Sequence, residues 1–255
     1  MIDRVPFPPA EEFQRRYVET ATPVIFTGAT DDWPALRKWS FDGWRASYGD
    51  RPITVGHTEK GRLVVSAKGG IPQSEIQLGE FLDTLEEESP PFYMLSPVEE
   101  RLPELMDDVR FPEVCRQARW KTSRIWVGAA GTTSRLHRDW PENLFAQIVG
   151  RKRFILIDKR LSARVYSHSR LSKVPNFSRV DIENPDYARF PKLRGVPQLS
   201  VVVEPGELLY IPRMWWHHVR SLEPSISINL WFGNGLVAAV SMLSQAYARL
   251  RKLRL

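Results

Sequence analysis

The sequence GTTSRLHRDWPENLFAQIVG, residues 131–150, contains the triplet around which the chain is organised, His137-Arg138-Asp139. Because successive side chains of an extended strand point to opposite faces, His137 and Asp139 face the same way while Arg138 faces away. Two groups that can bind a metal are thereby directed at one point. A third, His217, follows 78 residues after Asp139, near the end of the run GELLYIPRMWWHHVRS.

Two histidines and one carboxylate on one face, with further coordination positions open, form the ligand set of non-haem Fe(II) oxygenases. The HxD triplet alone, or His217 alone, is weak evidence for a metal site, since an HxD pair or a histidine beside tryptophans arises by chance in many proteins. The spacing of glycines and prolines around both strengthens the evidence. Gly131 lies six residues before His137. Similarly, Gly206 lies six residues before Pro212, which lies five before His217. These residues are typical of turns at strand ends, so both ligand-bearing strands are expected in one small barrel.

Other residues with ligand chemistry fit this site less well. His217 and His218 cannot both face the metal, because neighbouring strand residues point to opposite faces, and the spacing selects His217. His57 lies in an alternating strand pattern and is expected to be a packed or surface histidine. Cys115, the only cysteine, cannot form an internal disulfide and is expected to be a small buried residue.

The composition indicates one globular domain. The chain has 255 residues, of which 42% are hydrophobic, and it contains no repeat or low-complexity tract. No signal peptide and no membrane-spanning segment is expected, so a cytoplasmic location is the default. The net charge of +6 and the sequence pI of about 9.5 favour an anionic partner, which a nucleic acid, an acidic peptide or a dianionic cosubstrate would satisfy.

The first 122 residues are expected to form helices and strands beside the barrel. Apolar side chains at helical spacing predict helices over residues 9–20 and 76–88, and Ser40 is expected to cap a third that ends at Gly49. Alternating or continuous apolar runs predict four strands, at 23–28, 53–57, 63–65 and 92–95. The last of these would place the Tyr93 hydroxyl in a polar pocket. Short helices and loops are expected over 97–122.

The stretch NLFAQIVGRKRFILID predicts a hairpin of two apolar strands about Gly150-Arg151. Lys152 opens the second strand, in line with Phe154 and Leu156 at period two. A cation on an apolar face is costly unless an anion meets it, and the carboxylate of a cosubstrate would supply one. A lysine at the strand end that extends to water is the alternative interpretation.

The remainder of the chain is expected to complete the barrel. Residues 158–197, with four prolines and few periodic apolar runs, should form a long insertion that shapes a substrate site at the barrel mouth. Residues 201–212 predict a strand, a turn and a strand, and 225–232 predict the last strand, with Asn229 pointing into the barrel. A terminal helix over 234–255 has an apolar stripe that must pack on its own domain or on a second subunit.

From about residue 23 to residue 232 the chain resembles the cupin-like, JmjC-type Fe(II)/2-oxoglutarate hydroxylases, and most closely the asparaginyl hydroxylase that modifies hypoxia-inducible factor. Five runs occur in the family's order and nearly its spacing: GTTSRLHRD, ENLFAQIVGRKRFIL, DIENPDYARFP, EPGELLYIPRMWWHHV and SINLWF. The resemblance implies a mainly β fold with flanking helices and a double-stranded β-helix core of the jelly-roll or cupin type. It implies a single domain, made of a flank over 1–122, a barrel core over 123–232 with the insertion 158–197, and the C-terminal helix.

The same resemblance assigns eight residues to the site. The iron ligands would be His137, Asp139 and His217, and the cosubstrate contacts would be Tyr93, Ser134, Asn143, Lys152 and Asn229. Lys152 would pair with the distal carboxylate of 2-oxoglutarate, to which Tyr93 and Ser134 would donate hydroxyl hydrogen bonds. Ser134 stands where the relative has a threonine. Most of residues 162–184 match nothing in that relative, so the identity of its substrate does not transfer.

The resemblance implies a dioxygenase that uses Fe(II), 2-oxoglutarate and O2 to hydroxylate a protein or peptide side chain. Two alternatives stay open. The basic pI keeps a tRNA-base hydroxylase of the wybutosine type in view, while a cupin that binds a ligand without turnover is disfavoured by the complete ligand set with Lys152. Because the relative dimerises through C-terminal helices, a homodimer through residues 234–255 is expected.

Overall fold

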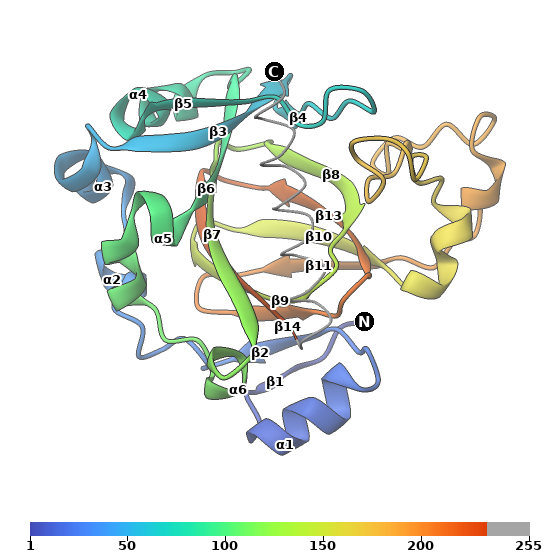
Figure 1. Cartoon of the computed structure of the whole chain (residues 1–255), viewed down its shortest axis with the longest axis horizontal. Coiled ribbons are helices and arrows are strands. Elements are labelled where there is room, and N and C mark those ends of the chain that lie inside the picture. The colour runs from blue at the N-terminus through green and yellow to red at the C-terminus, as the bar shows by residue number, and fades with distance from the viewer. Residues whose placement is uncertain (234–255) are drawn as a thin grey trace.

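The computed structural model describes residues 1–233, which form two β-sheets closed face to face into a jelly-roll barrel with helices outside it (Figure 1). The centre of the larger sheet is formed, in spatial order, by β12 (Leu208–Ile211), β9 (Glu142–Val149), β14 (Ser225–Gly233) and β7 (Trp120–Gly128). The smaller sheet contains β8 (Thr133–Arg138), β13 (Trp216–Ser221), β10 (Lys152–Ile157) and β11 (Leu199–Val203). The mainly β, jelly-roll fold expected from the sequence is confirmed.

Six strands from the first half of the chain extend these sheets. On the larger sheet, β2 (Val24–Thr27) and β1 (Arg4–Pro6) follow β12, and β6 (Phe92–Pro97), β3 (Pro52–Glu59) and β5 (Gln73–Gln77) follow β7. Strand β4 (Arg62–Leu63) turns back from β3 and joins the smaller sheet beside β8, so the two sheets are continuous at that edge. The strand expected over 63–65 is therefore shorter and begins one residue earlier.

The turn at Gly150 joins the two sheets, and the hairpin predicted there is wrong. β9 pairs with β12 and β14, whereas β10 pairs with β11 and β13. Gly150 has a φ of +67°, and a Cβ at this position would collide with the Pro224 carbonyl. The chain thus turns tightly against the start of β14 and crosses to the opposite sheet. Local turn residues are the same in both arrangements, which is why the sequence suggested pairing across the turn.

Short helices account for most of the remaining flank. Their bounds are α1 (Ala10–Phe13), continued by a π-helical turn (Gln14–Val18), α2 (Ala35–Lys38), α3 (Phe41–Tyr48), α4 (Leu78–Asp83), α5 (Val98–Arg101) and α6 (Glu113–Arg116). Single 3-10 segments occur at Thr84–Glu86, Pro103–Asp108, Lys159–Arg164 and Pro191–Leu193. Ser40 caps α3 as expected, since its Oγ accepts the Gly43 N–H at 3.1 Å. The helix expected from residue 76 begins at Leu78, because Ile76 and Gln77 belong to β5.

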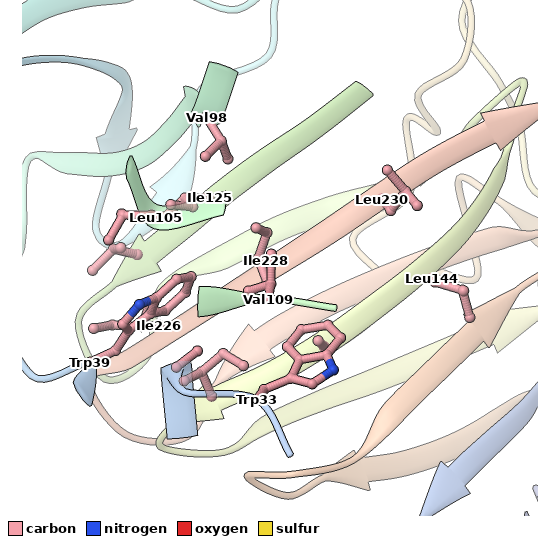
Figure 2. Packing of buried hydrophobic residues seen from close by; sticks show 14 of the residues in the cluster. Trp33, Trp39, Val98, Leu105, Val109, Ile125, Leu144, Ile226, Ile228 and Leu230 are labelled. Atoms are coloured by element: carbon pink, nitrogen blue, oxygen red, sulfur yellow. The ribbon is translucent and has the colours of Figure 1, made fainter. Parts of the chain in front are cut away.

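The flank packs against the outer face of the larger sheet. Figure 2 shows Trp33, Trp39, Val98 and Leu105 of the flank gathered around Ile125 of β7 and Ile226, Ile228 and Leu230 of β14. These side chains are almost completely buried. Full burial of one large apolar side chain stabilises a fold by about 1.5–3 kcal/mol, so this cluster holds the larger sheet firmly in place.

The insertion between β10 and β11 has a core of its own. Val180, Ile182, Phe190, Leu193 and Val196 are buried in a cluster with apolar side chains from the outer face of the smaller sheet. Much of residues 158–197 is therefore a cover for that sheet, in addition to the mouth loop expected from the sequence.

The expected terminal helix, residues 234–255, lies outside the described residues, and so does the dimer contact assigned to it. Within residues 1–233, none of the helices combines the length and the apolar character needed to cross a bilayer. His57 is half-buried and forms a hydrogen bond with Ser74 at 2.7 Å, as expected of a packed histidine.

Candidate active site

The three expected metal ligands meet inside the barrel. His137 lies on β8, Asp139 follows one residue after its end, and His217 lies opposite His137 on the neighbouring strand β13. The two imidazole ring centroids are 4.1 Å apart, and Nε2 of His217 is 3.6 Å from Oδ2 of Asp139. One potential ligand atom from each residue lies within 4.8 Å of the other two. This donor set of two nitrogens and one oxygen fits a divalent iron ion.

Backbone and side-chain contacts orient these ligands. Nδ1 of His137 lies 2.7 Å from the carbonyl oxygen of Arg135, and Nδ1 of His217 lies 3.1 Å from that of Trp215. Nδ1–H donation to these carbonyls leaves each Nε2 free to bind a metal. Burial, together with the neighbouring His137, lowers the pKa of His217 to about 4, so its imidazole is neutral at physiological pH. A neutral imidazole is the form that binds metal ions.

Asp139 is held from two sides. The indole Nε1–H of Trp231 on β14 donates to Oδ2 of Asp139 at 3.0 Å. The backbone carbonyl of Asp139 accepts the N–H of Met214 at 2.7 Å, which ties the ligand to the turn before β13. The Trp231 indole therefore fixes Oδ2, the oxygen that lies 3.6 Å from Nε2 of His217.

His218 points out of the barrel. The register between β13 and β8 shifts between His217 and Val219, and His218 lies in the shifted segment. Its ring is buried on the outer face, with Nε2 3.4 Å from Oε1 of Glu183 on the insertion. The structure therefore brings His217 into the candidate site and separates His218 from it, as the alternation along the strand predicts.

Lys152 is the second unusual group inside the barrel. Its side chain is completely buried at the start of β10, where Nζ donates to Ser227 Oγ at 2.8 Å and to the Tyr93 hydroxyl at 3.2 Å. Among the described residues it has no acidic partner. Burial lowers its pKa to about 7, and it raises the pKa of the Tyr93 hydroxyl far above the usual range. A buried cation with only neutral partners fits the carboxylate of a dianionic cosubstrate.

A single cavity connects Lys152's surroundings with the three metal ligands. Its polar lining includes Tyr93, Ser134, Asn143 and Asn229, all four of which were expected at the cosubstrate, and Phe145, Phe154, Ile211 and Val219 give it apolar walls. Nδ2 of Asn229 donates to Oδ1 of Asn143 at 3.1 Å, which fixes both amides. The metal ligands, the apolar walls and the buried amine beside Tyr93 match in chemical type the two ends and the methylene centre of 2-oxoglutarate.

Comparison with known proteins places the chain in a family. A family model for the cupin-like domain matches residues 9–235. The chain belongs to the cupin-like domain family. It is 35% identical to lysine-specific demethylase JMJ30 of Arabidopsis thaliana, over 88% of this chain and 53% of that protein. It is 32% identical to lysine-specific demethylase 8 of Xenopus tropicalis, over 91% and 52%. It is also 27% identical to the human bifunctional peptidase and (3S)-lysyl hydroxylase JMJD7, over 91% and 83%.

The chain spans about half the length of each of these two demethylases. The resemblance to JmjC proteins inferred from the motifs is confirmed at the level of the family, whose JmjC oxygenases use Fe(II), 2-oxoglutarate and O2. The narrower resemblance to the asparaginyl hydroxylase of hypoxia-inducible factor stays a prediction.

Four residues that contact a metal ligand or a cosubstrate residue of the site were not identified from the sequence. Trp231 binds Asp139, Trp126 donates its indole N–H to Oδ1 of Asn229 at 2.9 Å, Ser227 binds Lys152, and Phe177 stacks on His137 with ring centroids 5.0 Å apart. The alternation in SISINLWF, which indicated that Asn229 points inward, also applies to Ser227 and Trp231 two residues to either side. No periodic pattern indicated Phe177, because it lies on the irregular insertion.

Proposed function

We propose that this protein is an Fe(II)- and 2-oxoglutarate-dependent dioxygenase that hydroxylates a side chain of a protein or peptide. The observation that carries the proposal is the pairing of a convergent His137, Asp139 and His217 set with a buried Lys152 that has no acidic partner and that contacts Tyr93 in the wall of the same cavity. A metal-binding cupin without turnover needs the first group only. The presence of both supports an enzyme that holds a metal and an anionic cosubstrate side by side.

Some residues of the site would bind the metal or the cosubstrate, and others orient these binding residues. His137, Asp139 and His217 would hold Fe(II), while the Trp231 indole fixes the carboxylate of Asp139. Lys152 would donate to the distal carboxylate of 2-oxoglutarate, and its charge is satisfied only when that anion is bound. When bound, Fe(II), 2-oxoglutarate and O2 supply the oxidising power that inserts oxygen into a substrate C–H bond and releases succinate and CO2.

Hydroxyl and amide groups complete the cosubstrate pocket. Tyr93 already contacts the Lys152 amine and stays protonated, so its O–H can donate to a carboxylate. Ser134 would add a second hydroxyl donor. Asn143 and Asn229, locked by their mutual hydrogen bond, would present fixed amide dipoles near the metal. The apolar walls of the cavity limit access of water to the reacting centre.

The similarity to proteins described as lysine-specific demethylases and as a (3S)-lysyl hydroxylase supports a protein substrate over a tRNA base. Both descriptions name a reaction at lysine. The asparaginyl hydroxylase resemblance of the sequence motifs agrees with that substrate class.

We also propose a homodimer through residues 234–255. Light scattering should give the mass of a dimer for the intact chain and the mass of a monomer for Leu243→Glu. A monomeric mass for the intact chain would refute the dimer.

Calorimetry with Mn(II) in place of iron, followed by turnover with Fe(II), tests the function. About one metal per chain should bind, 2-oxoglutarate should bind only to the metal-loaded protein, and succinate should form under air. Mass spectrometry of peptides from treated cell extract should then show products heavier by one oxygen atom. Failure of 2-oxoglutarate to bind the metal-loaded protein would refute the proposal.

A further inference from the structure

The insertion carries most of the net charge of the chain. Residues 158–197 contain nine lysines and arginines and four acidic residues, a net charge of +5, whereas the whole chain has +6. Residues 1–157 and 198–233 together contain 23 basic and 26 acidic residues, a net charge of −3. The described part of the molecule is thus slightly acidic except for one strongly basic segment.

That basic segment adjoins the candidate active site. Phe177 stacks on His137 with an interplanar angle of 14°. The side-chain Nδ2–H of Asn176 donates to the backbone carbonyl of Arg138 at 3.2 Å, and the backbone carbonyl of Asn176 accepts the Arg138 N–H at 3.0 Å. The insertion lies to one side of the barrel next to β8, as the yellow and orange segment in Figure 1 shows. A molecule that reached the metal over this side of the barrel would pass the insertion.

Residues 169–173, SRLSK, form an exposed turn just before this contact. The Ser172 N–H donates to the Ser169 carbonyl at 2.9 Å, which closes the turn, and the Lys173 N–H donates to the Ala67 carbonyl at 2.9 Å, which anchors its C-terminal end. Leu171, at its tip, is 97% exposed. Besides the chain's first residue, only Trp140 and Leu171 are exposed large apolar side chains in residues 1–233, and Trp140 directly follows Asp139.

The cations of this turn lack partners. Arg170 and Lys173 are exposed and form no ion pair with an acidic residue in the described part of the chain. Arg138 stacks over the Trp216 ring at 4.8 Å and has no acidic partner there either. The backbone of Arg138 is joined to the segment just after this turn, since it exchanges two hydrogen bonds with Asn176. Neighbouring like charges with no anion between them favour an anionic partner.

We propose that residues 169–173, together with Arg138, form a docking surface for an acidic segment of the protein substrate, with an apolar residue of that segment packed on Leu171. The inference rests on the proposed function and names a feature of its substrate. An aliphatic side chain at the centre of the surface favours a peptide over a nucleic acid, because nucleic-acid bases are held by stacking on aromatic rings and arginine planes. Acidic residues near the target site of the substrate would give recognition that does not depend on the target side chain itself.

A random dodecapeptide library displayed on phage, panned against the intact protein, tests this surface without knowledge of the substrate. The bound peptides should be enriched in Asp and Glu beside Leu, Ile or Met. Enrichment of basic peptides, or no enrichment, would overturn the proposal. Panning needs neither metal nor cosubstrate, so its outcome is independent of whether 2-oxoglutarate binds, which decides the proposed function separately.

Paired charge reversals locate the binding. For the best acidic peptide, fluorescence anisotropy should show that Arg170→Glu with Lys173→Glu weakens affinity about tenfold or more, and that added salt weakens wild-type binding. Leu171→Ser should weaken it by a smaller factor. The matched control, Arg189→Glu with Lys192→Glu, reverses two exposed cations of the same insertion outside residues 169–173 and should leave affinity unchanged. Equal losses in both double variants would show a general charge effect and overturn the assigned surface.

A labelled uridine dodecamer provides the nucleic-acid arm of the same measurement. The acidic peptide should bind more tightly than this RNA to the intact protein at physiological salt. Tighter RNA binding that is lost in the Arg170→Glu, Lys173→Glu protein would assign the surface to nucleic acid and refute the peptide proposal. The melting temperatures of all variants should match that of the wild type, since the altered side chains are exposed.

Discussion

On the smaller sheet, residues of the same type have different partners on the inner face and on the outer face. Lys152 and Arg153 are neighbours on β10, yet the lysine is buried among neutral groups while the arginine forms an ion pair with Glu183. His217 and His218 are neighbours on β13, yet one faces the metal ligands and the other faces Glu183. On the outer face the charge of Arg153 is satisfied within the chain by Glu183 and stabilises it. On the inner face the charge of Lys152 is left for a ligand to satisfy, as expected of a binding site.

Removal of a ligand from the inner face should have the largest effect. Asp139→Ala takes away the only carboxylate of the set, so metal binding and 2-oxoglutarate turnover should both be abolished while the fold is retained. His218→Ala is the matched control on the outer face and should keep most of its metal affinity. Titration with Mn(II), followed by electron paramagnetic resonance, measures both. Metal loss in the His218 variant alone would reverse the choice between the two histidines.

The next effect concerns the cosubstrate. Lys152→Met keeps the length and apolar stem of the side chain but removes its charge, and it should weaken 2-oxoglutarate binding by roughly 2–5 kcal/mol, the range for loss of one partner of a buried charge pair. Arg153→Met, one residue away on the outer face, should leave the affinity nearly unchanged. Calorimetry on the Mn(II)-loaded proteins distinguishes the two. If Lys152→Met has the same dissociation constant for 2-oxoglutarate as the wild type, another cation binds the distal carboxylate of the cosubstrate.

The inner face was the more predictable of the two. His137, Asp139 and His217 were found from strand alternation and turn spacing, and Lys152 from its period-two alignment with Phe154, because barrel strands repeat a simple geometry that the sequence encodes locally. Resemblance to a known family supplied the roles of the other cosubstrate contacts. Pairing partners were less predictable, as the false hairpin at Gly150 shows, since a turn signal does not specify which sheet the next strand joins.

The outer face depends on contacts that no local pattern encodes. Glu183 lies in an irregular segment, and its contact with Arg153 follows from the way the whole insertion folds back on the sheet. The apolar residues of that segment, such as Val180 and Phe190, have no helical or strand period, so their common core could not be identified from spacing. Trp231 was overlooked for another reason: its role is a hydrogen bond to Asp139 from a strand of the opposite sheet.

Loss of Glu183 should test what the outer face contributes. Although burial alone would raise the pKa of its carboxyl, the bonds to Arg220 and the contact with His218 lower it well below the usual range. Breaking a buried ion pair costs about 3–5 kcal/mol, but the arginine side chains are 27% and 38% exposed, so screening should reduce the loss in Glu183→Gln to about 1–3 kcal/mol. Urea unfolding measures it. Metal binding should persist, because the ligands lie on the other face.

An exposed ion pair and the acid dependence of unfolding provide two further tests of the contribution of Glu183. Glu223→Gln, which breaks the exposed pair with Arg151, should cost no more than about 0.5 kcal/mol. Because the Glu183 pKa is lowered in the folded state, its contribution is present at neutral pH and is lost as pH falls below the usual carboxyl range of about 4. The wild type should therefore lose more stability on acidification than Glu183→Gln. Equal acid sensitivity would mean that Glu183 contributes nothing through its charge.

A pH dependence of cosubstrate binding is expected from the inner face alone. Burial lowers the pKa of Lys152 to about 7 in the unliganded protein, so the amine is protonated below that pH and increasingly neutral above it. A carboxylate binds the protonated form, and 2-oxoglutarate affinity should fall as pH rises above about 7, with a limit of about 1.4 kcal/mol per pH unit. The carboxylate in turn raises the lysine pKa, so binding at pH 8 should take up a proton. Calorimetry in two buffers of different ionisation enthalpy measures that uptake. In Lys152→Met both the pH dependence and the proton uptake should disappear, and an affinity that stays constant from pH 6.5 to about 8.5 in the wild type would show that Lys152 is charged throughout or does not meet the cosubstrate.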